Sequence, residues 1–205
     1  VPVSVDHSYG VAQKYLQEHQ NDNKEYWDKY VSQIEERGDL SGLLSGSKKG
    51  LRISEYKHII TPEEQILVIK DKLYTTLKEL SQREGVTLNA MLQYAWHKVL
   101  NIYTHNNQTV VGTTVSGRNL PVDDIESSVG LYINTLPLLV DHNNQSIKKR
   151  VIEAIKDIQG NINDINSKSN VSLSKLQKEG ERLFDSLFVY ENYPKSTNEV
   201  HLDRL

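Results

Sequence analysis

The clearest pattern of apolar and polar positions lies in residues 110–140, where two apolar runs flank a polar, glycine-marked segment. The first run, TVVGTTV, is rich in β-branched residues, which favour a buried strand over a helix. The following SGRN and a nearby proline are typical of a turn. The second run, residues 130–140, alternates as a strand does and places Tyr132, Asn134 and Leu136 on one face. The pattern predicts two strands joined by a loop.

One amide lies among the large apolar side chains of the second predicted strand. A buried amide without a hydrogen-bond partner costs about 1–3 kcal/mol. We therefore expect Asn134 either to bond to nearby backbone or to face a solvated channel.

Apolar positions spaced by three and four residues predict helices elsewhere in the chain. The predicted ranges are residues 8–18, 24–36, 73–80, 88–103 and 146–158, with a short helical segment at 171–177. Thr87 is a plausible N-cap for the fourth of these. Trp27 and Tyr30 belong to an aromatic stripe that we expect in the core. His97 lies off the apolar stripe of its helix, so it is predicted to be a solvated surface imidazole.

Shorter apolar runs predict additional strands, and polar runs predict loops. The predicted strands are residues 54–60, 67–69 and 182–190, and the predicted loops are residues 38–50 and 160–170. The glycine- and lysine-rich end of the first loop, residues 46–50, lacks both P-loop spacing and a preceding strand. It is therefore expected to be a surface loop without a nucleotide site.

Composition narrows the class of protein. With 205 residues the chain can form one sizeable domain or two small ones, and can bury roughly 70% of its unfolded surface. A net charge of −3, 37% hydrophobic residues and a mean hydropathy of −0.56 predict neither a membrane span nor nucleic-acid binding. The absence of cysteine excludes disulfides and thiolate nucleophiles. With no signal-peptide pattern at the start, a cytoplasmic protein is the simplest expectation.

No catalytic motif is present in the sequence. The seven histidines are isolated from one another, and neither a Gly-X-Ser-X-Gly elbow nor a His-Glu-X-X-His helix occurs. We therefore predict no catalytic residue and no metal site in this chain.

Two segments together resemble a known family. TTVSGRN, followed by IESSVGLYINTLPL at the observed spacing, is similar to the condensation domains of nonribosomal peptide synthetases. VTLNAMLQYAWHKVL and LFDSLFVYENYP also resemble segments of that family. The resemblance implies an α/β fold of the chloramphenicol-acetyltransferase-like type, with a mixed β-sheet flanked by helices. Residues 1–205 would then be a partial condensation domain, mostly its C-terminal lobe, without the N-terminal lobe that carries a His-His-X-X-X-Asp-Gly motif.

The resemblance also implies a function. Condensation domains form an amide bond between carrier-bound aminoacyl or peptidyl thioesters in antibiotic biosynthesis and other secondary metabolism. A lobe without the histidine motif should be inactive alone. It should bind no cofactor directly, because phosphopantetheine is carried by its partners. Those partners would be peptidyl carrier proteins, the N-terminal lobe of the same domain and adjacent synthetase domains. The resemblance places these residues at the substrate tunnel: Ser116, Gly117, Arg118, Asn119, Gly130, Tyr132, Asn134 and Thr135.

Several alternatives remain open at this stage. Arg118 could brace its loop by bonding carbonyls or acidic neighbours, and Asn134 could brace a strand. The chain could instead be half of an epimerization-type or acyltransferase domain, or a docking module that binds carriers without catalysis. Where many family members have a His-Gln pair, this chain has Lys168 and Ser169, which leaves the contacts of that loop in doubt. An exposed lobe interface would favour self-association.

Overall fold

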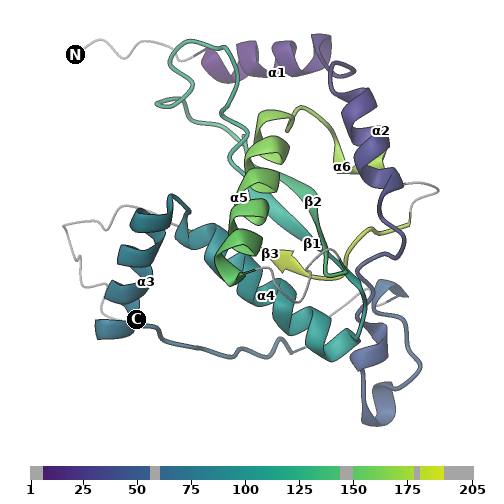
Figure 1. Cartoon of the computed structure of the whole chain (residues 1–205). Helices are drawn as coiled ribbons and strands as arrows, with labels where there is room; N and C mark the ends of the chain where they lie inside the picture. Colours follow the sequence, from purple (N-terminus) through teal and green to yellow (C-terminus); the bar gives the residue numbers. More distant parts are fainter. Residues whose placement is uncertain (1–6, 56–60, 144–149, 178–180, 192–205) are drawn as a thin grey trace, which may run out of the picture.

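A computed structural model describes residues 7–55, 61–143, 150–177 and 181–191 (Figure 1). Its centre is a three-stranded mixed sheet in the order β2-β1-β3. β1 (Gln108–Val115) pairs antiparallel with β2 (Asn134–Asp141), and β3 (Leu187–Phe188) runs parallel to β1. Helices α4 (Leu88–Thr104) and α5 (Val151–Ser167) pack against each other and against β1 and β2. The expected mixed sheet flanked by helices is confirmed.

The other helices surround this centre. They are α1 (Ser8–Glu18), α2 (Lys24–Ser32), α3 (Asp71–Glu84) and α6 (Leu173–Leu176), with 3-10 turns at Ser41–Leu43, Gly46–Lys48 and Ile53–Glu55. The predicted helices at 8–18, 73–80, 88–103 and 171–177 are confirmed within a few residues, whereas α2 ends before residue 36. The Thr87 side chain accepts a hydrogen bond from the Ala90 N–H, as expected of an N-cap.

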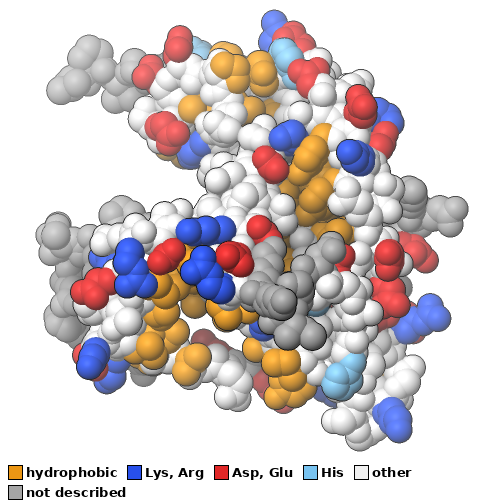
Figure 2. Space-filling view, in the orientation of Figure 1, with side chains coloured by type: hydrophobic (Ala, Val, Ile, Leu, Met, Phe, Trp, Pro, Cys, Tyr) orange, Lys and Arg blue, Asp and Glu red, His pale blue; other side chains and the backbone are white. Residues whose placement is uncertain are grey.

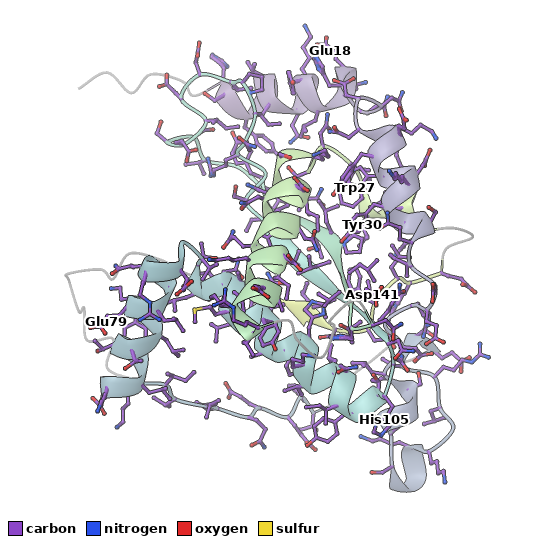
Figure 3. All side chains as sticks on the ribbon, viewed as in Figure 1. Glu18, Trp27, Tyr30, Glu79, His105 and Asp141 are labelled. Atoms are coloured by element: carbon purple, nitrogen blue, oxygen red, sulfur yellow. The ribbon has the colours of Figure 1, made fainter. Side chains whose placement is uncertain are left out.

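The aromatic stripe of α2 anchors that helix to the core (Figure 3). Trp27 is fully buried, and its indole N–H donates to the carbonyl of Lys168 at 2.9 Å. The Tyr30 hydroxyl accepts a hydrogen bond from the Leu139 backbone N–H at 2.9 Å. These two contacts hold α2 against the end of α5 and the edge of β2, so the prediction that both rings are core residues is confirmed.

Two predicted boundaries are wrong. The second strand begins at Asn134, because residues 130–133 have no ladder partner and Leu131 is 76% exposed. The predicted loop at 160–170 is mostly helix, since α5 continues to Ser167. Ile162 and Ile165 extend the apolar stripe of α5 past Gly160, which the helix tolerates.

Most of the three shorter predicted strands are not strands in the described residues. Residues 67–69 are irregular, and Ile66, Leu67 and Val68 are all strongly exposed, because no neighbouring strand pairs with them in the described part of the chain. The predicted strand at 54–60 begins inside a 3-10 turn, and its residues 56–60 lie outside the described ranges. Of residues 182–190, only the two of β3 and a single bridge between Gly38 and Phe184 pair as strand.

His97 is buried, which contradicts the prediction of a solvated imidazole. The face of α4 that packs on β1 includes polar residues. Gln93 donates to the Thr113 hydroxyl at 2.9 Å, and His97 Nδ1 lies 2.6 Å from the Thr109 hydroxyl. Threonine hydroxyls on the strand give each of these side chains one partner, while Gln93 Oε1 and His97 Nε2 are buried without a partner among the described residues. A polar residue at this helical spacing therefore does not mark the solvent side.

Candidate functional site

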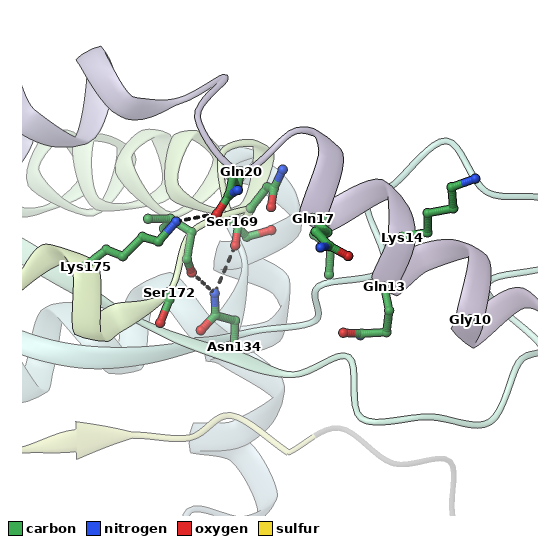
Figure 4. A pocket seen from close by; sticks show the side chains of 12 residues that line it. Gly10, Gln13, Lys14, Gln17, Gln20, Asn134, Ser169, Ser172 and Lys175 are labelled. Atoms are coloured by element: carbon green, nitrogen blue, oxygen red, sulfur yellow. Dashed lines mark hydrogen bonds between the residues drawn. The ribbon is translucent and has the colours of Figure 1, made fainter.

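A cavity of about 670 Å³ lies between α1 and residues 169–175, beside the start of β2 (Figure 4). Its lining residues come from three separate parts of the chain. They are Gly10, Gln13, Lys14, Leu16, Gln17, Gln20, Asn134, Ser169, Asn170, Val171, Ser172 and Lys175. Its volume falls in the range typical of sites for small molecules.

Amide, hydroxyl and ammonium groups dominate the polar part of the lining, and none of the lining residues is acidic. Lys175 Nζ donates to Gln20 Oε1 at 2.7 Å across the space between α6 and the end of α1. The side-chain amides of Gln13 and Gln17 make no hydrogen bond with another described residue, so they are available to a ligand. The cavity can therefore offer hydrogen bonds and positive charge.

Asn134 forms part of the cavity wall and is fully bonded. Its amide nitrogen donates to the carbonyls of Ser169 at 2.9 Å and Val171 at 2.7 Å, and its amide oxygen accepts from the Thr135 N–H at 2.8 Å. The prediction that Asn134 bonds nearby backbone is confirmed. Its role here is to hold residues 169–171 against the end of the sheet, which shapes the cavity.

Asn170 completes the link to α1. Its amide nitrogen donates to the carbonyl of His19 at 2.8 Å, at the C-terminal end of α1. Asn134 and Asn170 together fix the 169–171 segment between the sheet and α1. The wall of the cavity is thus built from backbone held in place by two amide side chains.

Arg118 braces the loop between β1 and β2. Its guanidinium donates to the carbonyl of Ile125 and lies 4.2 Å from the centre of the Tyr132 ring. The Tyr132 hydroxyl is 2.7 Å from the Ser128 hydroxyl, and its ring meets Tyr9 of α1 edge to face at 5.3 Å. The bracing alternative for Arg118 is therefore confirmed, and the loop is packed against the first turn of α1.

Two glycines make this packing possible. Gly117 has φ of +61°, and a Cβ there would lie 1.8 Å from the carbonyl oxygen of Tyr132. A Cβ on Gly130 would lie 2.2 Å from the Tyr9 ring. Only glycine permits both close approaches, because real Cβ atoms do not come so near to other heavy atoms.

Of the eight residues that the resemblance placed at the substrate tunnel, Asn134 is the one that lines this cavity. Ser116 and Asn119 are exposed in the loop, and Thr135 pairs with Thr114 in the sheet. The structure thus brings the loop residues together beside α1, next to the cavity. Whether all eight line a substrate tunnel stays a prediction.

Sequence reasoning missed most of the lining. Gln13, Gln17 and Gln20 repeat at spacings of four and three, which places three amides on one face of α1 and its extension. That spacing is the sequence feature that could have indicated this part of the cavity lining. Lys175 and Ser172 carried no signal, because their nearness to α1 depends on how a distant segment folds back.

Some kinds of site are absent from the part of the chain that the structure describes. Among those residues, no group of three or more histidine, aspartate and glutamate side chains is placed to hold a metal ion. The described helices also include none with the length and apolar character needed to cross a membrane.

Comparison with known proteins identifies the family. The sequence model of the Condensation domain matches residues 4–204. N-(5-amino-5-carboxypentanoyl)-L-cysteinyl-D-valine synthase of Amycolatopsis lactamdurans is 47% identical over 199 residues, which cover 95% of this chain and 5% of that protein. The synthase of the same name from Penicillium chrysogenum is 40% identical over 195 residues, which cover 93% of this chain and 5% of that protein. Bacitracin synthase 3 of Bacillus licheniformis is 33% identical over 177 residues, which cover 85% of this chain and 3% of that protein.

Solved structures agree on the fold. The first condensation domain of the calcium-dependent antibiotic synthetase, in complex with a substrate analogue, superposes with a TM-score of 0.67 at 16% identity. The match covers 96% of this chain and 41% of that structure. This chain therefore spans about two-fifths of a solved condensation domain and about one-twentieth of its curated relatives. Since the family model matches nearly the whole chain, the chain belongs to the condensation domain family.

Proposed function

We propose that this chain is part of a nonribosomal peptide synthetase condensation domain, which forms an amide bond between two carrier-bound thioesters. The observation that carries the proposal is the family match over residues 4–204, together with 47% identity to a peptide synthase over 95% of the chain. That relative is named for a peptide with a 5-amino-5-carboxypentanoyl group. We propose that this chain serves in the assembly of a peptide of that kind.

The reaction requires groups that this chain does not contain. The amine of one substrate attacks the thioester carbonyl of the other, the C–N bond forms, the C–S bond breaks and the thiol leaves. The sequence has no His-His-X-X-X-Asp-Gly motif to position or deprotonate the amine. The proposed contribution of this chain is one wall of the substrate tunnel, with the cavity beside Asn134 as part of it and the packed loop of Ser116–Asn119, Gly130 and Tyr132 beside it.

The cavity chemistry fits the arm that would deliver the substrates. A phosphopantetheine arm contains two amide groups, and Gln13 and Gln17 offer unbonded amides on the cavity side of α1. These are the residues that we expect to contact it. Carrier proteins, the N-terminal lobe and adjacent synthetase domains are the proposed partners, and a cytoplasmic location stays a prediction.

Reconstitution tests the proposal. The chain alone, and the same chain joined to an N-terminal lobe carrying the histidine motif, would each be mixed with two loaded carrier proteins, and the product followed by mass spectrometry. We expect an amide product from the joined protein and none from the chain alone. The control is the joined protein with both motif histidines replaced by alanine.

Other outcomes would support the alternatives. Carrier binding without amide formation by the joined protein would favour the docking module. Inversion of a carrier-bound residue without amide formation would favour the epimerization-type half.

A further inference from the structure

We propose that the cavity beside Asn134 binds an acyl group that bears a free carboxylate, and that Lys175 is the residue that recognises this charge. The inference rests on the proposed function only in taking the carboxylate to belong to a carrier-bound acyl group. Its physical basis is the uncompensated charge of the cavity, the anchored backbone of Lys175 and the hydrogen-bonding groups beside it.

The charge of the cavity is one-sided. Two lysines and no acidic residue line it. Lys14 lies 3.8 Å from Glu18 and extends away from the cavity in Figure 4, so its charge is largely balanced. Lys175 has no carboxylate within ion-pair distance among the described residues, and its side chain donates to the neutral amide of Gln20. A positive charge without a nearby counter-charge favours an anionic ligand.

The backbone of Lys175 is also held in place, and its side chain reaches the cavity from an exposed position. It lies in α6, next to the buried Leu176, and its backbone N–H donates to the carbonyl of Ser172 at 2.9 Å. The Asn134 amide fixes the segment leading into α6 through the carbonyls of Ser169 and Val171. The bond to Gln20 directs the ammonium across the cavity and leaves two of its three N–H donors for a ligand.

The neighbouring groups suit a polar acyl chain. The Ser172 hydroxyl and the Gln17 amide lie along the same cavity, and either can donate to a carboxylate oxygen or accept from an amino group. A volume of about 670 Å³ accommodates an acyl group of amino-acid size. A neutral acyl group would leave the ammonium without a counter-charge, so the cavity should discriminate by charge more than by shape.

A matched pair of ligands tests the inference on the 205-residue chain. The probes are the N-acetylcysteamine thioester of glutaric acid, which ends in a free carboxylate, and the same compound with that carboxylate as a methyl ester. Dissociation constants would be measured by amide chemical-shift titration. We expect the acid to bind about tenfold more tightly than the ester, as one charge-assisted hydrogen bond provides. We also expect added salt to weaken the binding of the acid and to leave the binding of the ester unchanged.

Substitution assigns the effect to one residue. Lys175→Met should bring the acid to the affinity of the ester while leaving the affinity of the ester unchanged. Lys175→Arg should keep part of the preference, because it keeps the charge. The control is Lys29→Met, on α2 and outside the cavity lining, which should bind both probes as the unaltered chain does.

The outcomes separate the inference from the proposed function. Equal affinity for the acid and the ester, or a preference that survives in Lys175→Met, would overturn the inference. So would binding of neither probe. Amide formation by the joined protein described above would in each case leave the proposed function standing. Conversely, a tenfold preference lost in Lys175→Met supports the inference even if the joined protein forms no amide bond.

Discussion

The hydroxyl of Thr109 lies between two imidazole rings, and this arrangement constrains their protonation. His97 Nδ1 is 2.6 Å from it and His142 Nε2 is 2.9 Å from it. A hydroxyl carries one proton, so Thr109 can donate to at most one of the two rings, and at least one ring must donate to it. Burial, with a smaller contribution from His142, lowers the pKa of His97 to about 3. Burial and Lys98 lower the pKa of His142 to about 4, against the opposite effect of Asp141.

Acid should therefore destabilise the fold. His97 is neutral in the folded chain, whereas in the unfolded chain it takes up a proton as the pH falls through its ordinary pKa of 6.5. The contribution of His97 to the free energy of unfolding should be constant above that pH and fall below it, and its loss should end near pH 3. Near pH 5 the loss from His97 alone should be about 2 kcal/mol.

Urea unfolding at a series of pH values measures this loss. His97→Gln keeps a polar group near Thr109 but removes the titration, so its stability should change less between pH 7 and pH 5. His7→Gln, at an exposed position, is the control and should keep the dependence of the unaltered chain. An identical dependence in His97→Gln would show that other groups cause the acid sensitivity.

Gly117 should be the glycine least tolerant of substitution in the loop between β1 and β2. Gly117→Ala places a Cβ against the Tyr132 carbonyl and also forces an L residue to φ of +61°. The left-handed conformation alone costs about 1–2 kcal/mol, and the backbone clash adds to it. We expect a loss of at least about 2 kcal/mol in thermal or urea unfolding. Gly42→Ala, which meets open space, should change stability by less than about 0.5 kcal/mol.

At the scale of elements, periodic apolar patterns predicted those helices and strands through which the pattern runs without interruption. β1 and α4 were found because an apolar run or stripe continues through each of them. The end of α5 was missed because Asn161, Asn163 and Asp164 indicate a loop, although Ile162 and Ile165 in the same stretch continue the apolar stripe. The start of β2 was misplaced because alternation persists at Leu131 and Ile133, with which no strand of the described ranges pairs. Strand pairing depends on two segments, so the pattern of one segment cannot predict where its pairing begins.

The continuation of α5 past Gly160 leads to a prediction of its own. This glycine lies inside a helix of 17 residues, and a Cβ there would meet nothing within 4 Å. Gly160→Ala should therefore stabilise the chain by about 0.5–1 kcal/mol, because alanine loses less backbone entropy in a helix. The measurement is the urea midpoint. Loss of stability would contradict a helical course through residues 160–167.

At the scale of the whole molecule, the cavity shows why the site was harder to predict than the fold. Its walls come from α1, from the first residue of β2 and from residues 169–175, and Asn134 and Asn170 join them. The sequence indicated Asn134 because an amide among apolar residues needs a partner. It did not indicate Lys175, because a lysine on a short helix has no distinguishing pattern in the sequence. Its position beside a cavity lined by no acidic residue depends on the tertiary fold.

The surface of the molecule is unusually apolar in places. Figure 2 shows hydrophobic side chains gathered over α3 and α4, and the surface is hollowed between α3 and the region of α1 with its neighbouring loop. Exposed apolar residues of α3 and α4 include Leu73, Ile102 and Tyr103. Ile66, Leu67 and Val68, which precede α3, are 77%, 85% and 67% exposed. Exposed apolar side chains that gather in this way mark an interaction site or an aggregation risk.

The 205-residue chain should therefore self-associate in a concentration-dependent way, as sedimentation velocity would show. Residues 66–68 combine exposed apolar side chains with backbone that pairs with no described strand, so they can pair with a strand of a neighbouring copy.

Replacing Leu67 with Asp and Val68 with Ser should shift the population toward monomer without lowering the free energy of unfolding, since neither side chain is buried. The same pair of changes at Leu131 and Val129, which are also exposed and lie in the loop between β1 and β2, is the control. If the changes at Leu131 and Val129 suppress association and those at Leu67 and Val68 do not, the loop between β1 and β2 is the surface through which the copies associate. Monomer at every concentration would mean that exposed apolar area alone does not drive contact between copies.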